Sequence, residues 1–207
     1  MRPERTGPIA GVVLAAGSSA RMGTNKLLLE LGGELVIRRA VRRTLEAGLD
    51  PALVVLGHDA DKIRGALAGL PCQPTLNPDW AHGMSASLRA GIAQVPPAAI
   101  AAVVVLPDMP LVTTAMIAEL ALRYRRGAAP IVASEYGGVL APPTLYDRAL
   151  FPELAIVDEP GCGKHVVKRH RDEAEVVPWP ERALTDLDVP ADYERVRSGL
   201  RHERDGG

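Results

Sequence analysis

Short apolar runs alternate with longer segments of helical periodicity along most of the chain. The runs predict five strands, at Ile9–Ala15, Ala52–Leu56, Cys72–Leu76, Ala101–Leu106 and Pro130–Ala133. Strands that are apolar along their whole length are typical of a parallel sheet buried on both faces. The pattern therefore predicts an α/β fold in which helices cover both faces of a mostly parallel sheet. Ala101–Leu106 is the most apolar run, so we expect this strand near the centre.

Apolar residues recur at helical spacing between these strands. They predict helices at Glu34–Ala47, Asp59–Ala68, Met84–Val95 and Thr113–Arg126. Thr113 is a residue type favoured at helix N-caps, which supports the start of the last of these helices.

One side of the first predicted helix is apolar, and its other side carries four arginines. They are Arg38, Arg39, Arg42 and Arg43. Clustered arginines can bind an anion, but a helix face rich in charged side chains is more often exposed to water. We interpret this face as solvated.

The alternation becomes less regular beyond Glu135. Tyr136–Gly138 predicts a turn, and Pro142-Pro143 is expected to begin a short helix that runs toward Leu150.

The last part of the chain predicts a helix at Gly163–His170, a strand at Glu175–Pro178 and a final helix at Pro190–Gly199. The polar tail His202–Gly207 is expected to be frayed. The sequence contains neither an internal repeat nor a long linker. We therefore expect its 207 residues to form one domain.

The composition of the chain limits the kinds of molecule that it is expected to bind. Hydrophobic residues make up 47% of the chain and charged residues 24%, which is ordinary for a globular protein. The formal net charge is −1 and aromatic residues are only 3%, so the basic patches and stacking surfaces that bind nucleic acid are not expected. No apolar run approaches the roughly 20 residues of a membrane helix. We expect neither nucleic acid nor a membrane as a partner.

The cysteines and the N-terminal residues indicate where in the cell the protein is expected. Cys72 and Cys162 are far apart in sequence and form no C-x-x-C pair, which favours reduced thiols. The N-terminal residues show no signal peptide. The expected location is the cytoplasm.

A glycine-rich turn with two cations follows the first predicted strand. It reads Leu14-Ala-Ala-Gly17-Ser-Ser-Ala-Arg21-Met-Gly23-Thr-Asn-Lys26. Gly17 and Gly23 allow a tight turn in which backbone N–H groups point at an anion, and Arg21 and Lys26 add positive charge. The spacing matches neither G-x-G-x-x-G nor a Walker A loop. The turn therefore predicts a phosphate site of another kind.

The pattern LAAG-x3-RMG-x2-K in this turn resembles the signature of the MobA-like nucleotidyltransferases. These enzymes move a nucleoside monophosphate from an NTP onto a phosphorylated acceptor. The resemblance covers roughly residues 9–195. It implies a single three-layer α/β/α domain with a Rossmann-like sheet of the nucleotide-diphospho-sugar transferase type. An N-terminal half, about residues 8–110, would bind nucleotide, and a C-terminal half, about residues 111–200, would bind the acceptor.

The resemblance also implies roles for residues of the turn. Arg21 and Lys26 would be catalytic. The nucleotide-binding positions would be Leu14, Ala15, Ala16, Gly17 and Gly23. The LAAG form, with Ala16 before Gly17, resembles the cytidylyl-transferring members, because the guanylyl-transferring members tend to read LAGG.

A second candidate site is Leu106-Pro107-Asp108-Met109-Pro110, which follows the predicted central strand. Ligands of open parallel sheets gather at the carboxyl ends of the strands, so Asp108 is well placed to bind Mg²⁺. From the residues alone, Asp108 could instead be a turn residue that caps the next helix, because aspartates are frequent at strand ends. The resemblance favours the metal, because the family carries its metal-binding aspartate in LPDMP-like segments.

Further acidic residues lie near the C-terminus. The segment from Thr185 to Tyr193 resembles the D-x-D-T-P-x-D-L segment of the family, whose first acidic position approaches the metal. That position is Asp186 here, which with Asp108 gives the expected Mg²⁺ ligands. Asp188 is left open because Val189 replaces the usual Thr. Asp192 is expected to cap the last helix.

The segment from Asn77 to Leu88 resembles the N-x-x-W-x-x-G-M-x-x-S-L pattern of the cytidylyl-transferring branch. A helix N-terminus here could donate N–H groups to a nucleotide, or it could be an ordinary capped helix with Trp80 packed against it. The resemblance implies that Gly83 and Ser85 contact nucleotide, and it leaves Trp80 open.

The match is weaker between Val157 and Lys164, where relatives carry a G-D-x-G-A-R or G-D-x-G-A-K turn on the acceptor side. Either Asp158 or Glu159 could take the acidic role, and Lys164 stands near the basic position.

Together these resemblances imply transfer of CMP from CTP to the phosphate of molybdopterin, with Mg²⁺ as cofactor and pyrophosphate as product. The implied partners are a nucleoside triphosphate, a molybdopterin-type acceptor and, in passing, a molybdoenzyme or its chaperone. Three alternatives stay open: guanylyl transfer, a different phosphorylated acceptor, and a catalytically silent nucleotide-binding cofactor chaperone.

Overall fold

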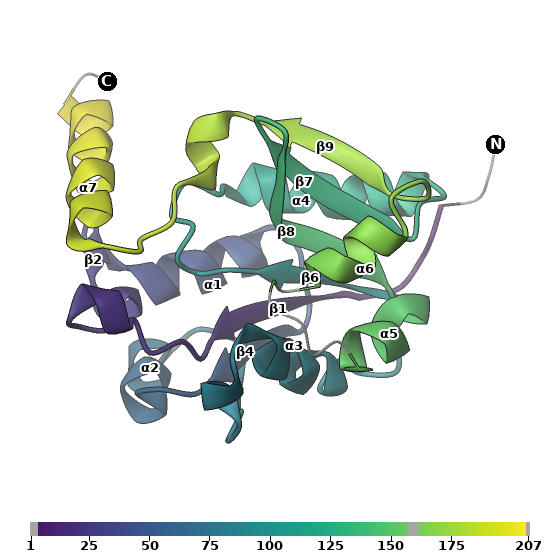
Figure 1. Cartoon of the computed structure of the whole chain (residues 1–207), viewed down its shortest axis with the longest axis horizontal. Helices are drawn as coiled ribbons and strands as arrows, with labels where there is room; N and C mark the ends of the chain where they lie inside the picture. Colours follow the sequence, from purple (N-terminus) through teal and green to yellow (C-terminus); the bar gives the residue numbers. More distant parts are fainter. Residues whose placement is uncertain (1–3, 157–160, 162, 206–207) are drawn as a thin grey trace.

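The computed structural model describes residues 4–156, 161 and 163–205, and it contains a twisted central sheet between layers of helices (Figure 1). The sheet has seven strands in the order β5-β4-β1-β6-β8-β7-β9. They are β1 (Ile9–Ala15), β4 (Ala52–Leu56), β5 (Gln73–Leu76), β6 (Ala101–Val105), β7 (Ile131–Tyr136), β8 (Val139–Asp147) and β9 (Glu175–Trp179). A separate ribbon pairs β2 (Glu30–Leu31) with β3 (Glu34–Leu35).

Most of the sheet is parallel, as the sequence predicts. β5, β4, β1 and β6 run parallel to one another, and β9 runs parallel to β7. Only β8 is antiparallel to its neighbours β6 and β7. The apolar strand β6 is the middle one of the seven, which confirms its predicted central position.

Helices pack on both faces of the sheet. The first face carries α1 (Val36–Glu46), α2 (Ala60–Ala66) and α4 (Thr114–Arg126). The second carries α3 (Met84–Ala93), α5 (Phe151–Ile156) and α6 (Lys164–Arg169). The long α7 (Pro190–Asp205) follows at the C-terminus. Short 3-10 turns lie at Ala20–Met22, Lys26–Leu28, Trp80–His82, Arg148–Leu150 and Glu181–Leu184. Within the described residues, no helix is long and apolar enough to cross a membrane.

Strand β1 shows why both faces are covered. Ile9 and Val13 enter the core under α1, α2 and α4, whereas Val12 and Leu14 enter the core under α3, α5 and α6. Successive side chains of a strand point to opposite faces, so a continuous apolar run needs two apolar layers. Each such side chain contributes about 1.5–3 kcal/mol through burial.

The order of the strands places two loops together. After β1 the chain forms β4 and then β5 on one side, and it returns to form β6 on the other side of β1. The loops that leave the carboxyl ends of β1 and β6 therefore meet at the point where the strand order reverses. Ligands bind at such a point in open α/β sheets.

The predicted helix at Pro142-Pro143 is wrong, because these residues lie inside strand β8. Proline has no backbone N–H group, and the pairing of β8 with β7 requires none at these two positions. Between Ala133 and Glu135 the pairing of β7 with β8 shifts register, and the two prolines fall in the unpaired part. Proline is tolerated in strands at such irregularities.

The other element predictions hold with small shifts at the ends. Thr113 accepts a hydrogen bond from the Met116 amide, which confirms it as the N-cap of α4. The last helix is longer than expected, since α7 continues through residues that were predicted to be frayed.

The interpretation of the arginine face of α1 as solvated is wrong for most of its side chains. Arg38 donates two hydrogen bonds to carbonyls at and beyond the end of α2. Arg42 pairs with Glu34 and Glu46. Arg43 donates to two carbonyls of the loop after β6. These arginines tie α1 to neighbouring segments.

Candidate active site

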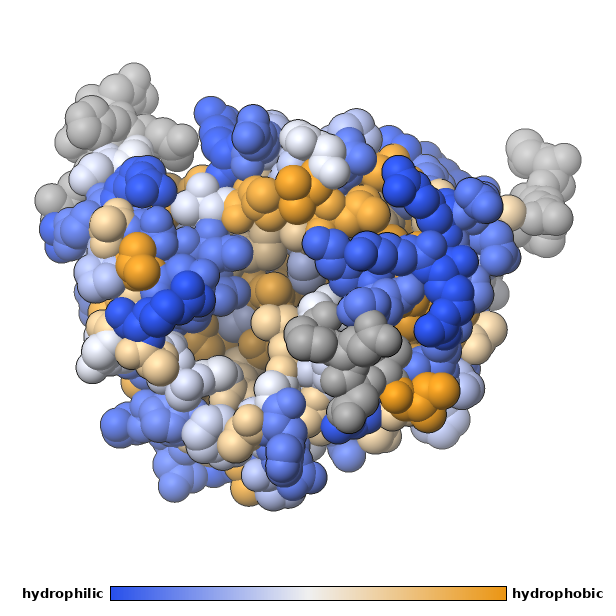
Figure 2. All heavy atoms as spheres, in the orientation of Figure 1, coloured by the Kyte–Doolittle hydropathy of each residue, from blue (hydrophilic) through white to orange (hydrophobic). Residues whose placement is uncertain are grey.

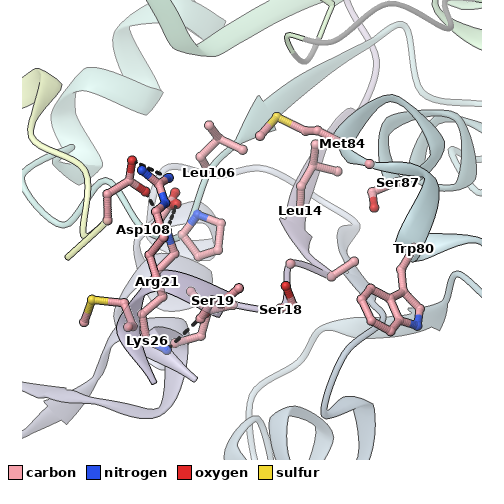
Figure 3. Close-up of a pocket in the computed structure, with 18 of the residues that line it drawn as sticks. Leu14, Ser18, Ser19, Arg21, Lys26, Trp80, Met84, Ser87, Leu106 and Asp108 are labelled. Atoms are coloured by element: carbon pink, nitrogen blue, oxygen red, sulfur yellow. Dashed lines mark hydrogen bonds and ion pairs between the residues drawn. The ribbon is translucent and has the colours of Figure 1, made fainter. Parts of the chain in front are cut away.

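An ammonium group lies between two carboxylates where the loops after β1 and β6 meet (Figure 3). Lys26 Nζ is 2.6 Å from Asp108 Oδ2 and 3.3 Å from Asp188 Oδ1. The side chains of Lys26 and Asp108 are only 15% and 21% exposed, so water screens their attraction weakly. Arg21 Nη2 reaches Asp188 Oδ2 at 2.8 Å from the solvent side. The structure thus brings together both predicted cations and the predicted aspartate.

The charges at this site shift each other's titration. Burial by itself would lower the pKa of Lys26, but the carboxylates of Asp108 and Asp188 outweigh it and the pKa is raised. Burial would raise the pKa of Asp188, but Lys26 and Arg21 outweigh it and this pKa is lowered. Lys26 and Asp188 are therefore both ionised at neutral pH.

Asp186 lies beside the same cluster. Among the described contacts it forms no ion pair. Desolvation, followed by the negative charges of Asp108 and Asp188, raises the pKa of Asp186 to about 6. A carboxylate that is destabilised by neighbouring carboxylates favours the binding of a cation between them.

The carboxylates of Asp108 and Asp186 fit a divalent cation that takes most of its ligands from substrate and water. Asp108 Oδ1 is buried and has no hydrogen-bond partner, so one oxygen of this carboxylate is available as a ligand. Across the described part of the chain, no three Asp, Glu, His or Cys side chains gather as a metal site. Mg²⁺ is commonly held by one or two carboxylates together with substrate phosphates and water. Asp108 and the nearby Asp186 match that pattern.

The glycine-rich turn places Lys26 through local backbone conformation. Ser19 (φ 53°) and Gly23 (φ 68°) both adopt the left-handed region and flank the 3-10 turn Ala20–Met22. The Ser19 hydroxyl then accepts a hydrogen bond from the Lys26 amide at 3.2 Å. The expectation that Gly17 provides a tight turn is only partly right, because Gly17 has no positive φ. A Cβ on Gly17 would meet no protein atom within 4 Å.

Asn25 fixes the other end of this turn. Its side-chain oxygen accepts from the Leu27 amide at 3.1 Å, and its Nδ2 donates to Asp59 Oδ2 at 3.2 Å. Asp59 precedes α2, so the turn is attached to the first turn of that helix.

Backbone contacts bring the C-terminal carboxylates to Asp108. The Leu187 amide donates to the Asp108 carbonyl at 3.0 Å. The Asp192 carboxylate accepts from the amides of Asp188 and Val189, at 3.2 and 3.0 Å. Asp192 therefore shapes the segment that precedes α7, a structural role in keeping with its expected place at the helix start.

A cleft of about 460 Å³ opens beside this cluster. In Figure 3, Lys26, Arg21 and Asp108 lie at one side of the cleft, and Trp80 and Ser87 lie at the other. Leu14, Met84 and Leu106 lie between them. Figure 2 shows this face of the molecule hollowed near its centre, with apolar residues on the floor. The arrangement suits a ligand with a charged part and a flat, less polar part.

Several residues with an expected nucleotide role line this cleft, and others do not. Those that line it are Leu14, Ala16, Gly17 and Gly83. Ala15 is buried in the sheet, Gly23 lies outside the lining, and Ser85 is 4% exposed and is not one of the lining residues. Ser87 lines the cleft in the place expected for Ser85, and its hydroxyl accepts from Asn77 Nδ2 at 3.2 Å.

The acceptor-side residues are less well placed by the structure. Asp158 and Glu159 lie outside the described residues. Lys164 begins α6, is exposed, and does not line the cleft.

Sequence reasoning left Asp188 open and missed Ser87 and Arg43 at the site. Ser87 belongs to the same segment as Ser85, and two positions along an α-helix lie on nearly opposite sides of it, so the two serines cannot both face the cleft in the same way. Arg43 gave no signal, because the carbonyls that it contacts are remote in sequence.

The family described as MobA-like NTP transferase domain matches residues 11–174. The bifunctional protein GlmU of Anaeromyxobacter sp. (strain K) is 43% identical over 75 residues, which are 35% of this chain and 15% of that protein. This chain therefore corresponds to a small part of that relative.

Two relatives match over more of their length. Nicotine blue oxidoreductase of Paenarthrobacter nicotinovorans is 28% identical over 187 residues, 86% of this chain and 85% of that protein. A probable molybdenum cofactor guanylyltransferase of Opitutus terrae is 32% identical over 124 residues, 60% of this chain and 59% of that protein.

Among solved structures, Rv0371c from Mycobacterium tuberculosis superposes with a TM-score of 0.83 and 28% identity. The superposition covers 93% of this chain and 98% of that one. A structure of the same protein in complex with manganese gives a TM-score of 0.79 at 27% identity, over 92% of this chain and 98% of that one.

Proposed function

We propose that this chain, which belongs to the MobA-like NTP transferase family, moves CMP from CTP to the phosphate of a molybdopterin-type acceptor and releases pyrophosphate. Family membership supports nucleotidyl transfer as the type of reaction. The observation that carries the proposal is the contact of Lys26 with Asp108 at the edge of the cleft. We propose that this largely buried cation and carboxylate bind an NTP and its counter-ion.

The proposed reaction is a direct displacement. An oxygen of the acceptor phosphate forms a bond to the α-phosphorus of CTP, and the bond from that phosphorus to the bridging oxygen of the β-phosphate breaks. The bond electrons leave with pyrophosphate. The acceptor phosphate is already ionised at neutral pH, so the reaction needs no general base. Positioning and charge neutralisation supply most of the catalysis in reactions of this type.

Lys26 and Arg21 are the proposed cationic catalysts. Lys26 is nearly buried and fixed by its two carboxylate contacts, so its ammonium offers a concentrated charge to the α-phosphate. Arg21 is 69% exposed and lies closer to solvent, where it can neutralise the departing pyrophosphate. The backbone of the glycine-rich turn, including Gly17 and Gly23, is the proposed seat of the phosphates.

Mg²⁺ is the proposed cofactor, with Asp108 and Asp186 as its protein ligands. When bound, it would neutralise charge on the triphosphate oxygens. The partnerless Oδ1 of Asp108 and the crowded carboxylate of Asp186 support this assignment. Asp188 is already engaged with Lys26 and Arg21, and we propose that it positions these two cations.

The nucleoside is proposed to occupy the part of the cleft away from Lys26. Leu14, Ala16 and Gly83 line that part, together with Trp80 and Ser87. The LAAG form of the turn, which reads Ala15-Ala16-Gly17, favours cytosine. Ser87 replaces Ser85 as the hydroxyl that faces the cleft, and Ser85 retains at most an indirect role in this proposal.

Guanylyl transfer is the second candidate, and the match to a probable molybdenum cofactor guanylyltransferase favours it. In either case we propose that the whole chain acts as one domain. Its first half, about residues 8–110, would bind nucleotide, and its second half, about residues 111–200, would bind the acceptor and transiently a molybdoenzyme or its chaperone.

Pyrophosphate release by the purified protein tests the proposal. The protein is incubated with molybdopterin, Mg²⁺ and CTP, GTP or ATP in parallel. We expect release with CTP and not with ATP. Release with GTP alone selects the second candidate, and no release with any nucleotide contradicts nucleotidyl transfer to molybdopterin.

A further inference from the structure

The loop that carries Asp108 has few backbone bonds of its own. It runs from the end of β6 to the N-cap of α4, and two of its residues, Pro107 and Pro110, have no N–H group. Within the loop, the Met109 amide donates to Leu106 at 3.4 Å and the Val112 amide donates to Met109 at 3.2 Å. The first bond is long, and the second lies at the upper end of the ordinary range. A loop with so few internal bonds needs external support to keep a side chain in place.

Arg43 supplies support from the opposite element. Its Nη1 donates to the Pro110 carbonyl at 2.8 Å and to the Val112 carbonyl at 2.5 Å. Val112 is 4% exposed, so its carbonyl has little access to water as an alternative donor. Burial and the neighbouring Arg39 and Arg42 lower the pKa of Arg43 to about 10, which leaves it charged at neutral pH.

We propose that Arg43 is a positioning residue for the active site: it holds the loop after β6 so that Asp108 meets Lys26 and can accept the cofactor cation. The kinetic consequence rests on the nucleotidyl transfer proposed above. Arg43 itself does not line the cleft, so it acts through the backbone of the loop.

The contact of Arg43 joins helix α1 to the loop that carries Asp108. α1 packs against the first face of the sheet, and Arg43 lies in its last turn. From there the guanidinium reaches the carbonyls of Pro110 and Val112, which lie shortly before Thr113, the N-cap of α4. On the other side, the Leu187 amide bonds to the Asp108 carbonyl. Beside the ion pair of Asp108 with Lys26 and the burial of Met109 and Val112, hydrogen bonds from Arg43 and Leu187 thus hold the backbone of the loop.

The same helix offers a matched control. Nη1 of Arg38 also donates to two backbone carbonyls, those of Ala66 and Ala68, at 2.7 and 2.9 Å. This contact ties α1 to the end of α2 and does not touch the Asp108 loop. Arg38→Met therefore removes a bond pair of the same chemistry from the same helix, away from the site.

Amide hydrogen exchange of the free protein tests the positioning role directly. In Arg43→Met, the peptide that covers residues 106–113 should exchange about tenfold faster than in wild type, and Arg38→Met should leave it unchanged. If Arg43→Met and wild type exchange this peptide equally, the proposal is overturned. Arg43→Gln is the second variant, because its shorter amide keeps a polar end and loses the reach to both carbonyls. It should show the same acceleration.

A kinetic split completes the test. With CTP and molybdopterin, kcat of Arg43→Met should fall about a hundredfold while KM for CTP changes little, because a displaced Asp108 disturbs the transition state more than ground-state binding. An equal loss in Arg38→Met would overturn the specific role of Arg43. If wild type itself shows no turnover, the proposed function fails, and the exchange experiment still decides the role of Arg43.

Discussion

The ammonium of Lys26 and the carboxylate of Asp108 meet at 2.6 Å, although they come from loops after different strands. β1 and β6 are adjacent and parallel, so the turn after one and the loop after the other share a single edge of the sheet. This contact explains why two motifs remote in sequence form one site. It also defines which substitutions should stop the reaction without unfolding the protein.

Replacement of the ammonium is the first prediction. Lys26→Met keeps the length of the side chain and removes its charge. Turnover should fall by about two to three orders of magnitude, because among the described residues that line the cleft no other cation is held by two carboxylates. Pyrophosphate release measures the effect. Lys62→Met, which removes an exposed lysine paired with Asp59, is the control and should keep wild-type turnover.

Neutralisation of the central carboxylate is the second prediction. Asp108→Asn is nearly isosteric, so the loop should keep its fold, but the neutral amide is a poor ligand for Mg²⁺. We expect turnover to fall by about three orders of magnitude, with an unchanged circular dichroism spectrum. Asp79→Asn is the matched control, since Asp79 is 72% exposed and does not line the cleft. Substantial turnover by Asp108→Asn would exclude the proposed metal role.

The third prediction separates the two carboxylates of the C-terminal segment. Asp186→Asn should weaken the affinity for Mn²⁺, used as a probe in the presence of CTP, by about tenfold. Asp188→Asn should leave Mn²⁺ affinity closer to wild type and lower turnover, because it releases Lys26 and Arg21. Electron paramagnetic resonance of free Mn²⁺ measures the affinities. The reverse pattern would assign the metal to Asp188.

A pH dependence of stability is the fourth prediction. His170 lies 2.9 Å from Glu153 and 3.2 Å from Glu173, and these hydrogen bonds raise its pKa above 6.5. Protonated His170 therefore stabilises the fold. This contribution is complete below about pH 6.5 and is lost as the pH rises through the raised pKa.

His170→Gln should accordingly lower the free energy of unfolding at about pH 5.5 and change it little at about pH 9. Urea denaturation at both pH values measures the difference. His82→Gln, which removes a 75% exposed histidine, should have little effect at either pH. An equal loss for His170→Gln at both pH values would contradict the prediction.

The parallel half of the fold was readable from the sequence because its signals are local. Ile9–Ala15 is a continuous apolar run, and β1 has the same bounds. Thr113 sits directly before an amphipathic helix, where a threonine side chain can bond only to the next turn. Pro142 and Pro143 misled the prediction because proline is rare in strands. Only the register shift opposite Ser134 makes room for them, and that shift is a property of two paired strands.

The site was predictable where one segment carries the chemistry. Lys26 and Asp108 each follow a strand, and parallel strands end at one edge, so their meeting could be expected. The sequence could not show which of the C-terminal carboxylates contacts Lys26, because this depends on the Leu187 contact with the Asp108 carbonyl. Arg43 shows the same limit, since a half-buried guanidinium on a polar helix face has the sequence pattern of a solvated one.

The contact between Leu187 and Asp108 also divides the sequence into a scaffold and a late addition. The last described strand ends at Trp179, so all seven strands of the sheet precede Leu187 and Asp188 in the sequence. Asp188 supplies one of the two carboxylates that hold the ammonium of Lys26, and Asp108 supplies the other. The sheet and the completion of the charged cluster are thus encoded in separate parts of the chain, and a truncation after Trp179 removes the second carboxylate while it spares the sequence of every strand.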